Sequence, residues 1–323
     1  MTAVAPSAGF VLAIDIGGTK TAAALAGRDD VPQHTLVAPS RAGEGPDAVV
    51  ETVRLLAERL LAAADERYGA MITLAGVGIG TAGVVDAGTG TIVSSTDTFA
   101  DWPGTRLADR VRAALAERLA DGAPIAVQND VDAHASGEFL HGAAAGASSA
   151  LVVAVGTGVG AGVIVDGRPV RGAHHVGGEL AHLPIRGAEH LRCPCGRTGH
   201  LEAIGAGLGL HRHYLSLGGD PAVTDARGVA AAAAGGDGRA VQAIADSAAA
   251  VGRALAGAAA LIDPERIVIT GGVPQIGDAW WQAMLAAYRD DAIDALQNTP
   301  ILPGALGDDA PLRGAAASAW RNR

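Results

Sequence analysis

One structural pattern occurs twice in this sequence. Residues 10–26 and residues 150–167 each consist of an aliphatic run, a glycine-rich turn and a second aliphatic run. Such runs are typical of buried β-strands, and the glycines between them mark tight turns. The repeat therefore predicts two α/β lobes, each led by a β-hairpin. A chain of 323 residues is long enough for two such lobes with a cleft between them.

Composition and charge exclude several classes of protein. A hydrophobic content of 49 % and a charged content of 18 % indicate a globular chain and not a disordered one. The net charge of −10 argues against binding to nucleic acid or to an anionic membrane, because phosphate groups need clustered cations. The opening residues MTAVAPSAG lack the basic and apolar regions of a signal peptide, and the alanine-rich segments carry regular charges. We therefore expect neither a leader nor a membrane span.

The segment 179–202 concentrates sulfur and imidazole side chains. It holds both cysteines of the chain, in a Cys-x-Cys arrangement that does not form a secreted disulfide framework, so we expect a reducing cytoplasm. Zn²⁺ prefers sulfur and imidazole ligands and needs four of them for a closed structural site. The predicted zinc ligands are His182, Cys193, Cys195 and His200. Three other histidines compete for the fourth place: His174, His175 and His190. Two incidental thiols are the alternative.

The turn of the first hairpin has the residues of a phosphate-binding loop. Its sequence is Asp15-x-Gly17-Gly18-Thr19-Lys20. Glycines let backbone N–H groups approach phosphate oxygens, threonine adds a hydroxyl donor, and aspartate can hold hydrated Mg²⁺. The spacing is not that of a Walker A loop. Among 24 basic residues Lys20 is the only lysine, which favours a local requirement for it, although an ordinary turn remains the alternative.

Two further glycine clusters follow strands. Gly156-Thr157-Gly158 in the second hairpin predicts a second phosphate loop. The series Gly78-x-Gly80-x-x-Gly83 matches a dinucleotide fingerprint, but that fingerprint must open a helix. Residues 84–95 are instead β-like and rich in turn residues, so we exclude a nucleotide-redox function.

A strand over 124–130 ends in Asn129-Asp130, and a helix is expected from about 132 to 145. A strand end that opens into a helix is where open α/β sheets bind their ligands. A carboxylate there can accept the proton of a hydroxyl group, as the catalytic aspartate of kinases does. Without further context, an Asn-Asp pair is equally typical of a helix cap.

Further elements are predicted from hydrophobic spacing and turn residues. Strands are expected over 72–79 and 267–270, the latter followed by Gly271-Gly272. Other helices are expected over 46–68, 203–217, 225–234, 239–262, 278–296 and 312–321.

Taken together, the motifs resemble those of the ROK family (repressors, open reading frames and sugar kinases), part of the sugar kinase/Hsp70/actin superfamily. The family pattern G-E-x-x-H, followed by C-x-C-G-x-x-G-C-x-E, is matched between Gly178 and Glu202. His200 stands where the family usually has a third cysteine, so a Cys₂His₂ site is expected. The N-D-x-[ND] motif is matched at 129–132, and Ala82 replaces the proline of G-I-G-x-P-G. The resemblance covers about residues 10–320.

The resemblance implies a two-lobed actin/hexokinase-like (ribonuclease H-like) α/β fold with an inter-lobe cleft and a structural zinc loop. The smaller lobe would comprise residues 1–128, with a C-terminal helix over about 305–323 packing back on it. The larger lobe would comprise residues 129–304 and contain the zinc loop. Family members are commonly dimers or tetramers, so a homo-oligomer is implied.

The activity implied is ATP-dependent phosphorylation of a hexose at its primary (6-) hydroxyl, as in glucokinases, with Mg²⁺ and a structural Zn²⁺. By resemblance Asp130 is the catalytic base, and the loop 94–104 with Trp102 closes over the sugar, although packing explains Trp102 equally well. The implied sugar-binding residues are Gly83, Asn129, Glu179, His182 and Glu202. The implied residues for ATP and Mg²⁺ are Asp15, Gly17, Gly18, Thr19, Lys20, Gly156, Thr157, Gly158, Gly271 and Gly272.

Two alternatives stay open. The first is a kinase for N-acetylglucosamine or N-acetylmannosamine, because pocket shape decides between a hydroxyl and an acetamide and motifs do not reveal it. The second is a sugar-responsive regulator. Regulators of the family carry an N-terminal winged helix, and a phosphate loop that begins at Asp15 is expected to leave no room for one.

Overall fold

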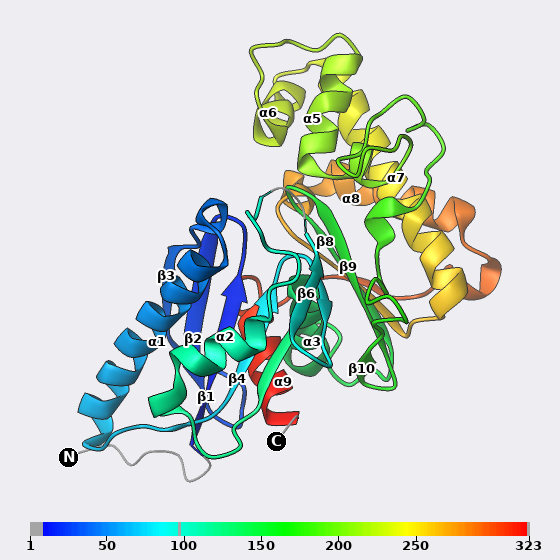
Figure 1. The fold of residues 1–323 in the computed structure, drawn as a ribbon. Coiled ribbons are helices and arrows are strands. Elements are labelled where there is room, and N and C mark those ends of the chain that lie inside the picture. Colours follow the sequence, from blue (N-terminus) through cyan, green and yellow to red (C-terminus); the bar gives the residue numbers. More distant parts are fainter. Residues whose placement is uncertain (1–8, 96–97, 322–323) are drawn as a thin grey trace. The chain divides into compact units, whose positions relative to one another are not determined.

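The computed structural model describes residues 9–95 and 98–321. Its chain forms two compact units, each built on its own five-stranded sheet (Figure 1). Unit 1 comprises Met1–Gly146, Arg171–Gly177 and Asp308–Arg323. Unit 2 comprises Ala147–Val170 and Gly178–Gly307. The two predicted α/β lobes are thus confirmed.

The sheet of unit 1 has the strand order β3-β2-β1-β4-β7. Its strands are β1 (Phe10–Ile16), β2 (Lys20–Ala26), β3 (Pro32–Pro39), β4 (Leu74–Thr81) and β7 (Ile125–Asn129). The first three pair antiparallel, whereas β4 lies parallel to both β1 and β7. The register sets Asp15 opposite Gly80 and Thr81 opposite Asn129, which brings the carboxyl ends of β1, β4 and β7 together.

The sheet of unit 2 repeats this topology with the order β10-β9-β8-β11-β12. Its strands are β8 (Ala150–Val155), β9 (Val159–Val165), β10 (Arg168–Pro169), β11 (Arg266–Thr270) and β12 (Ile301–Pro303). Again the first three in sequence pair antiparallel, and β11 lies parallel to β8 and β12. The sequence repeat is therefore a repeat of strand topology, with β8 and β9 in the places of β1 and β2.

Helices cover both faces of the first sheet. α1 (Pro46–Tyr68) buries Val49, Val53 and Leu56 with one face of the sheet, at the spacing that the sequence predicted. On the other face α9 (Asp309–Arg321), red in Figure 1, packs its alanines against β1. α9 also lies against α3 (Asp130–His141) at a distance that admits no side chain, because a Cβ on Gly137 or Gly314 would overlap the facing helix backbone. α2 (Leu107–Ala114) completes the unit's helices among the described residues.

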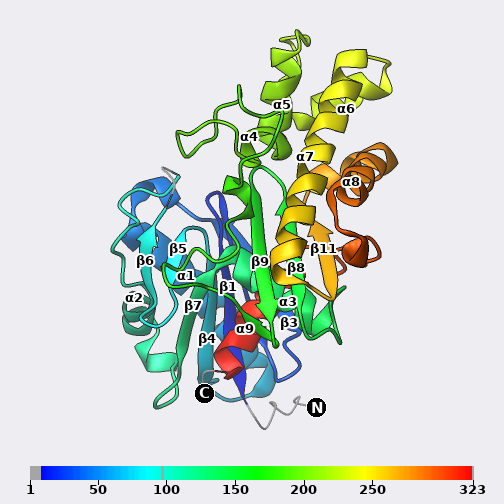
Figure 2. The same cartoon turned by 90° about the vertical axis from the view of Figure 1, so that its right-hand side faces the viewer.

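The helices of unit 2 are α4 (Glu202–Gly205), α5 (Gly207–Ser216), α6 (Ala226–Ala234), α7 (Gly238–Ile262) and α8 (Asp278–Asp291). Figure 2 shows α7 running along β8 and β11, and it contributes much of the buried core. Within the described ranges, α7 is also the one helix long and apolar enough to cross a membrane by length and composition, but 61 % of its apolar window is buried, as in the core helix of a soluble protein.

Several helix limits differ from those predicted. The helix expected over 203–217 is divided at Ala206, which has an extended backbone, and Gly207 N–H donates to the Gly156 carbonyl instead of continuing the first helix. The helix expected over 278–296 ends at Asp291, and a 3-10 turn follows at Asp294–Leu296. α3 begins at Asp130 and ends at His141, where 132 to about 145 was expected. Long-range contacts set these ends, and local spacing does not reveal them.

The division between the units also lies elsewhere than in the sequence-based scheme. That scheme separates residues 128 and 129, whereas the compact units separate at Gly146 and Ala147. The close packing of α3 on α9 is the physical reason, since it keeps α3 with the first sheet.

The region directly after β4 is β-structured and does not open a helix, as the sequence predicted. β4 continues into a two-stranded sheet formed by β5 (Val84–Asp86) and β6 (Thr91–Ser94). Of the loop 94–104, residues 96 and 97 lie outside the described residues. Trp102 is fully buried, and its ring stacks on Phe99 with centroids 5.0 Å apart. Packing therefore accounts for Trp102.

Candidate active site and metal centre

Two carboxylates meet at the carboxyl edge of the first sheet. Asp15 lies near the end of β1 and Asp130 at the first residue of α3, directly after β7. Both approach Gly80 of the intervening strand, because a Cβ built there would lie 3.6 Å from Asp130 Cα and 3.9 Å from Asp15 Oδ1. The sheet thus brings together two residues that are far apart in sequence.

The pKa values of both aspartates are shifted upward. Burial, followed by the neighbouring Asp130 charge, raises the pKa of Asp15 to about 7. Burial also raises the pKa of Asp130. Such a pair favours a proton or a cation between its members, because like charges at short range cannot both ionise freely. The donor set therefore fits Mg²⁺, which prefers oxygen ligands.

Asn129 fixes the start of α3. Its Oδ1 accepts a hydrogen bond from Val131 N at 2.8 Å, which is the N-cap of the helix. Its Nδ2 donates to the Gly83 carbonyl at 2.9 Å. The side chain thereby ties the helix that carries Asp130 to the turn after β4. Asn129 and Gly83, both implied to bind sugar, are brought together in this way.

The first glycine turn is an exposed hairpin end. Gly17 N–H donates to the Lys20 carbonyl at 3.0 Å, and Ser40 Oγ donates to the Gly17 carbonyl at 2.6 Å. Thr19 and Lys20 are exposed, and Lys20 Nζ lies 3.7 Å from Asp308 Oδ2. An ion pair between side chains as exposed as these contributes little stability, so Lys20 is available to a ligand at low cost.

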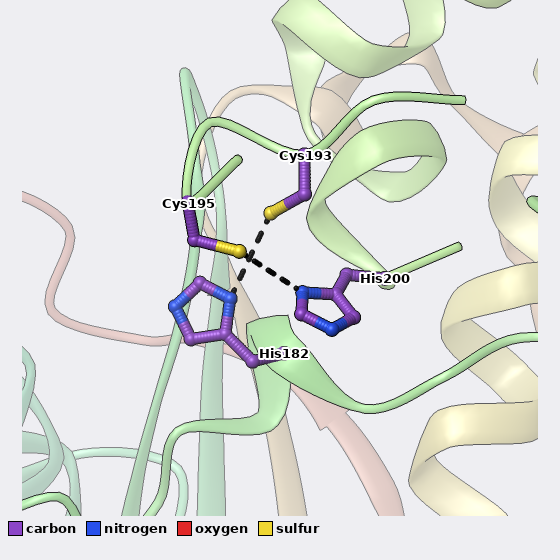
Figure 3. A group of neighbouring side chains, drawn as sticks. All are labelled: His182, Cys193, Cys195 and His200. Atoms are coloured by element: carbon purple, nitrogen blue, oxygen red, sulfur yellow. Dashed lines mark hydrogen bonds between the residues drawn. The ribbon is translucent and has the colours of Figure 1, made fainter. Parts of the chain in front are cut away.

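In unit 2 the four predicted metal ligands converge, as Figure 3 shows. Their ligand atoms all lie within 4.8 Å of one another. Cys193 Sγ lies 3.7 Å from His182 Nδ1, and Cys195 Sγ lies 3.3 Å from His200 Nδ1. A tetrahedral Zn²⁺ with its usual bond lengths places sulfur and nitrogen ligands about 3.5 Å apart. Both distances are close to this spacing, so the four residues fit a zinc ion.

Hydrogen bonds between backbone groups build the loop that holds these ligands. Cys193 N–H donates to the Arg197 carbonyl at 2.8 Å, and Gly196 N–H donates to the Cys193 carbonyl at 2.9 Å. The second half of the loop returns along the first, since Ile185 N–H donates to the Gly199 carbonyl at 2.8 Å. Backbone hydrogen bonds alone thus join the two halves of the loop.

The two thiols are free and differ in acidity. Burial raises the pKa of Cys193 to about 11. A hydrogen bond from the Arg197 backbone lowers the pKa of the exposed Cys195. A thiol binds a metal as thiolate. The positive charge that stabilises the thiolate of the buried Cys193 would therefore have to come from the metal cation.

The two implied sugar-binding glutamates lie beside the cluster. His182 presents Nδ1 to Cys193, and its Nε2 lies 3.6 Å from Glu179 Oε2. Cys193 Sγ donates to Glu202 Oε2 at 3.8 Å. A Cβ on Gly158 would lie only 2.7 Å from Glu202 Oε1, so the second glycine turn lies close to this carboxylate. Unit 2 therefore joins Gly158, Glu179, His182 and Glu202 to the metal cluster.

A cavity of about 580 Å³ lies beside the other half of the second glycine turn. This volume is in the range of small-molecule sites. The predicted residues at its wall are Gly156, Thr157 and Gly272. Its polar side chains include Asp225, Arg227 and Gln275. Sequence motifs did not point to these last three, because each lies on a segment whose neighbours in space are distant in sequence.

The predicted site residues thus form two sets. Asp15, Gly83, Asn129 and Asp130 gather in unit 1, and the metal ligands gather in unit 2 with the second glycine turn and both glutamates. Sequence reasoning also missed Asp308, the ion-pair partner of Lys20.

The fold, together with the two sets of site residues, is that of an α/β protein of the class to which sugar kinases belong. The sequence profile of the ROK family matches residues 11–322, and the chain belongs to that family.

Solved structures of this family show the same fold over almost the whole chain. The ROK hexokinase from Thermus thermophilus matches with a TM-score of 0.81 and 31 % identity, over 97 % of this chain and 98 % of that one. The ROK family glucokinase from Streptomyces griseus, in complex with glucose and AMPPNP, matches with a TM-score of 0.76 and 28 % identity, over 97 % of this chain and 100 % of that one.

Two curated relatives are more similar in sequence. The bifunctional enzyme NanE/NanK of Brucella melitensis is 34 % identical over 95 % of this chain and 53 % of its own length, so the chain spans about half of that relative. The N-acetylmannosamine kinase of Citrobacter koseri is 33 % identical over 81 % of this chain and 83 % of its own.

Proposed function

We propose that this chain is an ATP-dependent sugar kinase that phosphorylates the primary (6-) hydroxyl of a hexose, with glucose as the first candidate. The carboxylate pair Asp15 and Asp130 carries the proposal, because it offers a base and a cation site at one sheet edge. The complex of the Streptomyces griseus relative with glucose and a nucleotide analogue supports the choice of substrates.

In the proposed reaction Asp130 accepts the proton of the sugar hydroxyl while that oxygen attacks the γ-phosphorus of ATP. A bond forms between the sugar oxygen and phosphorus, the bond from phosphorus to the β–γ bridging oxygen breaks, and ADP leaves. The raised pKa of Asp130 increases its proton affinity and suits it to this role. The proton passes to solvent after the sugar phosphate dissociates.

The remaining roles follow the two sets of residues. We assign the nucleotide phosphates to the turns Gly17–Lys20 and Gly156–Gly158, and the nucleoside to the cavity beside Gly272. Asp15 would hold Mg²⁺, which when bound neutralises phosphate charge. Asn129 and Gly83 would lie at the sugar in unit 1.

Glu179, His182 and Glu202 would bind sugar hydroxyls in unit 2. The four Cys/His residues would hold a structural zinc ion, which when bound fixes the orientation of its ligands. His182 would use Nδ1 for the metal and keep Nε2 for the sugar, as its contacts with Cys193 and Glu179 support. Since both cysteines are free, the proposal includes a reducing compartment.

An ADP-release assay over glucose, mannose, fructose, N-acetylglucosamine and N-acetylmannosamine tests this function. We expect Mg·ATP-dependent turnover with at least one sugar and phosphorus NMR of the product that indicates a 6-phosphate. Folded, metal-loaded protein that turns over none of these sugars would refute the proposal.

A second candidate function is phosphorylation of an N-acetyl sugar. The 33 % identity to the Citrobacter koseri N-acetylmannosamine kinase favours it. The same assay decides, because a kinase built for an acetamide would leave polar groups unpaired when it binds glucose. Higher kcat/KM for an N-acetyl sugar than for glucose would select this alternative.

A further inference from the structure

One short segment belongs to unit 1, although the residues before and after it in the sequence belong to unit 2. After β10 the chain joins unit 1 at Arg171 and returns to unit 2 at Gly178. We call Arg171–Gly177 the crossing segment. Its ends are tied together, because Gly177 N–H donates to the Arg171 carbonyl at 2.8 Å. It is thus a closed loop that fixes the backbone of Arg171.

The guanidinium of Arg171 contacts the residues on either side of Asn129-Asp130. Its Nε lies 3.4 Å from Asp132 Oδ2, and its Nη2 donates to Gln128 Oε1 at 3.3 Å. One side chain therefore spans the end of β7 and the first turn of α3. The extended guanidinium of arginine suits this arrangement, since one edge can lie beside the Asp132 carboxylate while Nη2 donates to Gln128, which the compact ammonium group of lysine does not allow.

Both partners of Arg171 are buried. Asp132 is 7 % exposed and Gln128 is 2 % exposed. A buried carboxylate needs a counter-charge, and a buried carboxamide needs its hydrogen bonds. Gln128 also donates from Nε2 to the Gly314 carbonyl at 3.3 Å, which continues the connection to α9. Hydrogen bonds thus link Arg171 through Gln128 to Gly314 of α9, next to the start of α3.

A second contact holds the crossing segment at its far end. His175 Nε2 lies 4.0 Å from Asp86 Oδ1 of β5. The turn between β4 and β5 contains Gly83, the acceptor of the Asn129 side chain. The crossing segment therefore contacts the start of α3 and the end of β5, the strand that directly follows Gly83.

We propose that Arg171 is a positioning residue that holds the first turn of α3, and with it the Asp130 carboxylate, in the geometry needed for phosphoryl transfer. The inference rests on the proposed kinase function, and it deepens that function by adding a residue that acts through Asp132 and Gln128. An error of about 1 Å in the position of a reacting group can cost 10²-fold in rate, so a small shift of the helix start has a large effect.

The test compares Arg171→Met and Arg171→Lys with the control Arg168→Met. Arg168 is an exposed arginine on β10, and its replacement removes the same charge without touching α3. We expect Arg171→Met to lower kcat about 10- to 100-fold with the KM for ATP nearly unchanged. Arg171→Lys should recover part of the loss through its charge, and Arg168→Met should match the wild type.

Two further measurements separate positioning from general damage. In a double-mutant cycle, Asp132→Asn should add little to the effect of Arg171→Met, because both changes break the same contact. Hydrogen exchange of the peptide 125–135 should be faster in Arg171→Met and unchanged in Arg168→Met. A wild-type kcat in Arg171→Met, or a loss of kcat without faster exchange, would overturn the proposal.

The exchange measurement needs no substrate. If the wild type phosphorylates no sugar of the panel, the kinase function fails, while slow exchange in the wild type and fast exchange in Arg171→Met would still support the hold on α3.

Discussion

The two sheets share a strand order but carry different chemistry at the turn between their first two strands. In unit 1 an aspartate, Asp15, stands one residue before the end of β1, whereas Ala154 holds the equivalent place in β8. The last strand of the five-stranded sheet in unit 1, β7, runs into Asp130, while its counterpart in unit 2, β12, ends in Pro303 without a carboxylate. A repeated backbone topology therefore does not repeat the chemistry, which depends on single side chains at the strand ends.

Electrostatics differ between the units for the same reason. The two aspartates of unit 1 both lie near Gly80 on the strand between them, and burial raises both pKa values. The cluster of unit 2 places imidazole and thiol groups on one closed loop. The first arrangement suits proton transfer and a hard cation, and the second suits a borderline metal with a structural role.

Removal of the Asp130 carboxylate should have the largest effect and tests whether unit 1 supplies the catalytic base. Asp130→Asn keeps the size of the side chain but cannot accept the proton, so we expect kcat to fall by about 10²–10⁴-fold. Calorimetry should show unchanged sugar binding, because the base acts mainly in the transition state. Asp121→Asn, at an exposed site of unit 1, is the matched control. Turnover near the wild-type level in Asp130→Asn would show that Asp130 is not the catalytic base.

The second test concerns the metal of unit 2. Elemental analysis should find about one zinc per chain in the wild type and almost none in Cys193→Ser, since Cys193 is the buried sulfur of the set. A loss of about 2–3 kcal/mol in the free energy of unfolding would lower Tm by roughly 5–10 °C. A chelator should lower the Tm of the wild type and leave that of the variant unchanged. Zinc-free protein with full stability and activity would contradict a structural metal.

Much of the fold was visible in the sequence because its signals are local. The hairpin repeat and the spacing of α1 depend on neighbours within a few residues, and the structure confirms both. The contact between α3 and α9 was not visible, because it depends on glycines 137 and 314 meeting across a long stretch of chain. That contact decides where the units divide.

The candidate site was predictable to the same extent. All four residues of the Cys/His cluster lie within 182–200, so their spacing alone suggested a shared metal. The nearness of Asp15 to Asp130 was not predicted, because strand order, and not spacing along the chain, brings them together. Arg171 had no signal, since its partners are residues of another strand and helix.

A third experiment sharpens the electrostatic difference through pH. The pKa of Asp15 is raised from 3.8 to about 7, so the folded state binds its proton more tightly than the unfolded state. Its contribution to stability is therefore greatest below pH 3.8 and is lost as pH rises towards about 7. The difference in unfolding free energy between Asp15→Asn and the wild type should grow over this window by on the order of 2–4 kcal/mol.

Urea unfolding of both proteins at several pH values without Mg²⁺ measures this difference, and the other titrating groups cancel in it. Added Mg²⁺ should reduce it, because a bound cation lowers the pKa of its ligand. A difference that does not vary with pH would show that Asp15 ionises normally and that the two acids of unit 1 do not interact.

The smallest expected effect tests which residue completes the metal set. His200→Cys restores the third cysteine usual in the family, so we expect zinc to be retained and Tm to change by only about 2 °C or less. The variant loses the ring contact between His200 and His182, whose centroids are 5.3 Å apart, and gains one negative charge near Glu202. Both changes are mildly unfavourable. His200→Ala should release the zinc, because it removes a ligand atom and supplies none. If His200→Ala keeps its zinc, another histidine is the fourth ligand, and the closed loop of unit 2 does not by itself define the site.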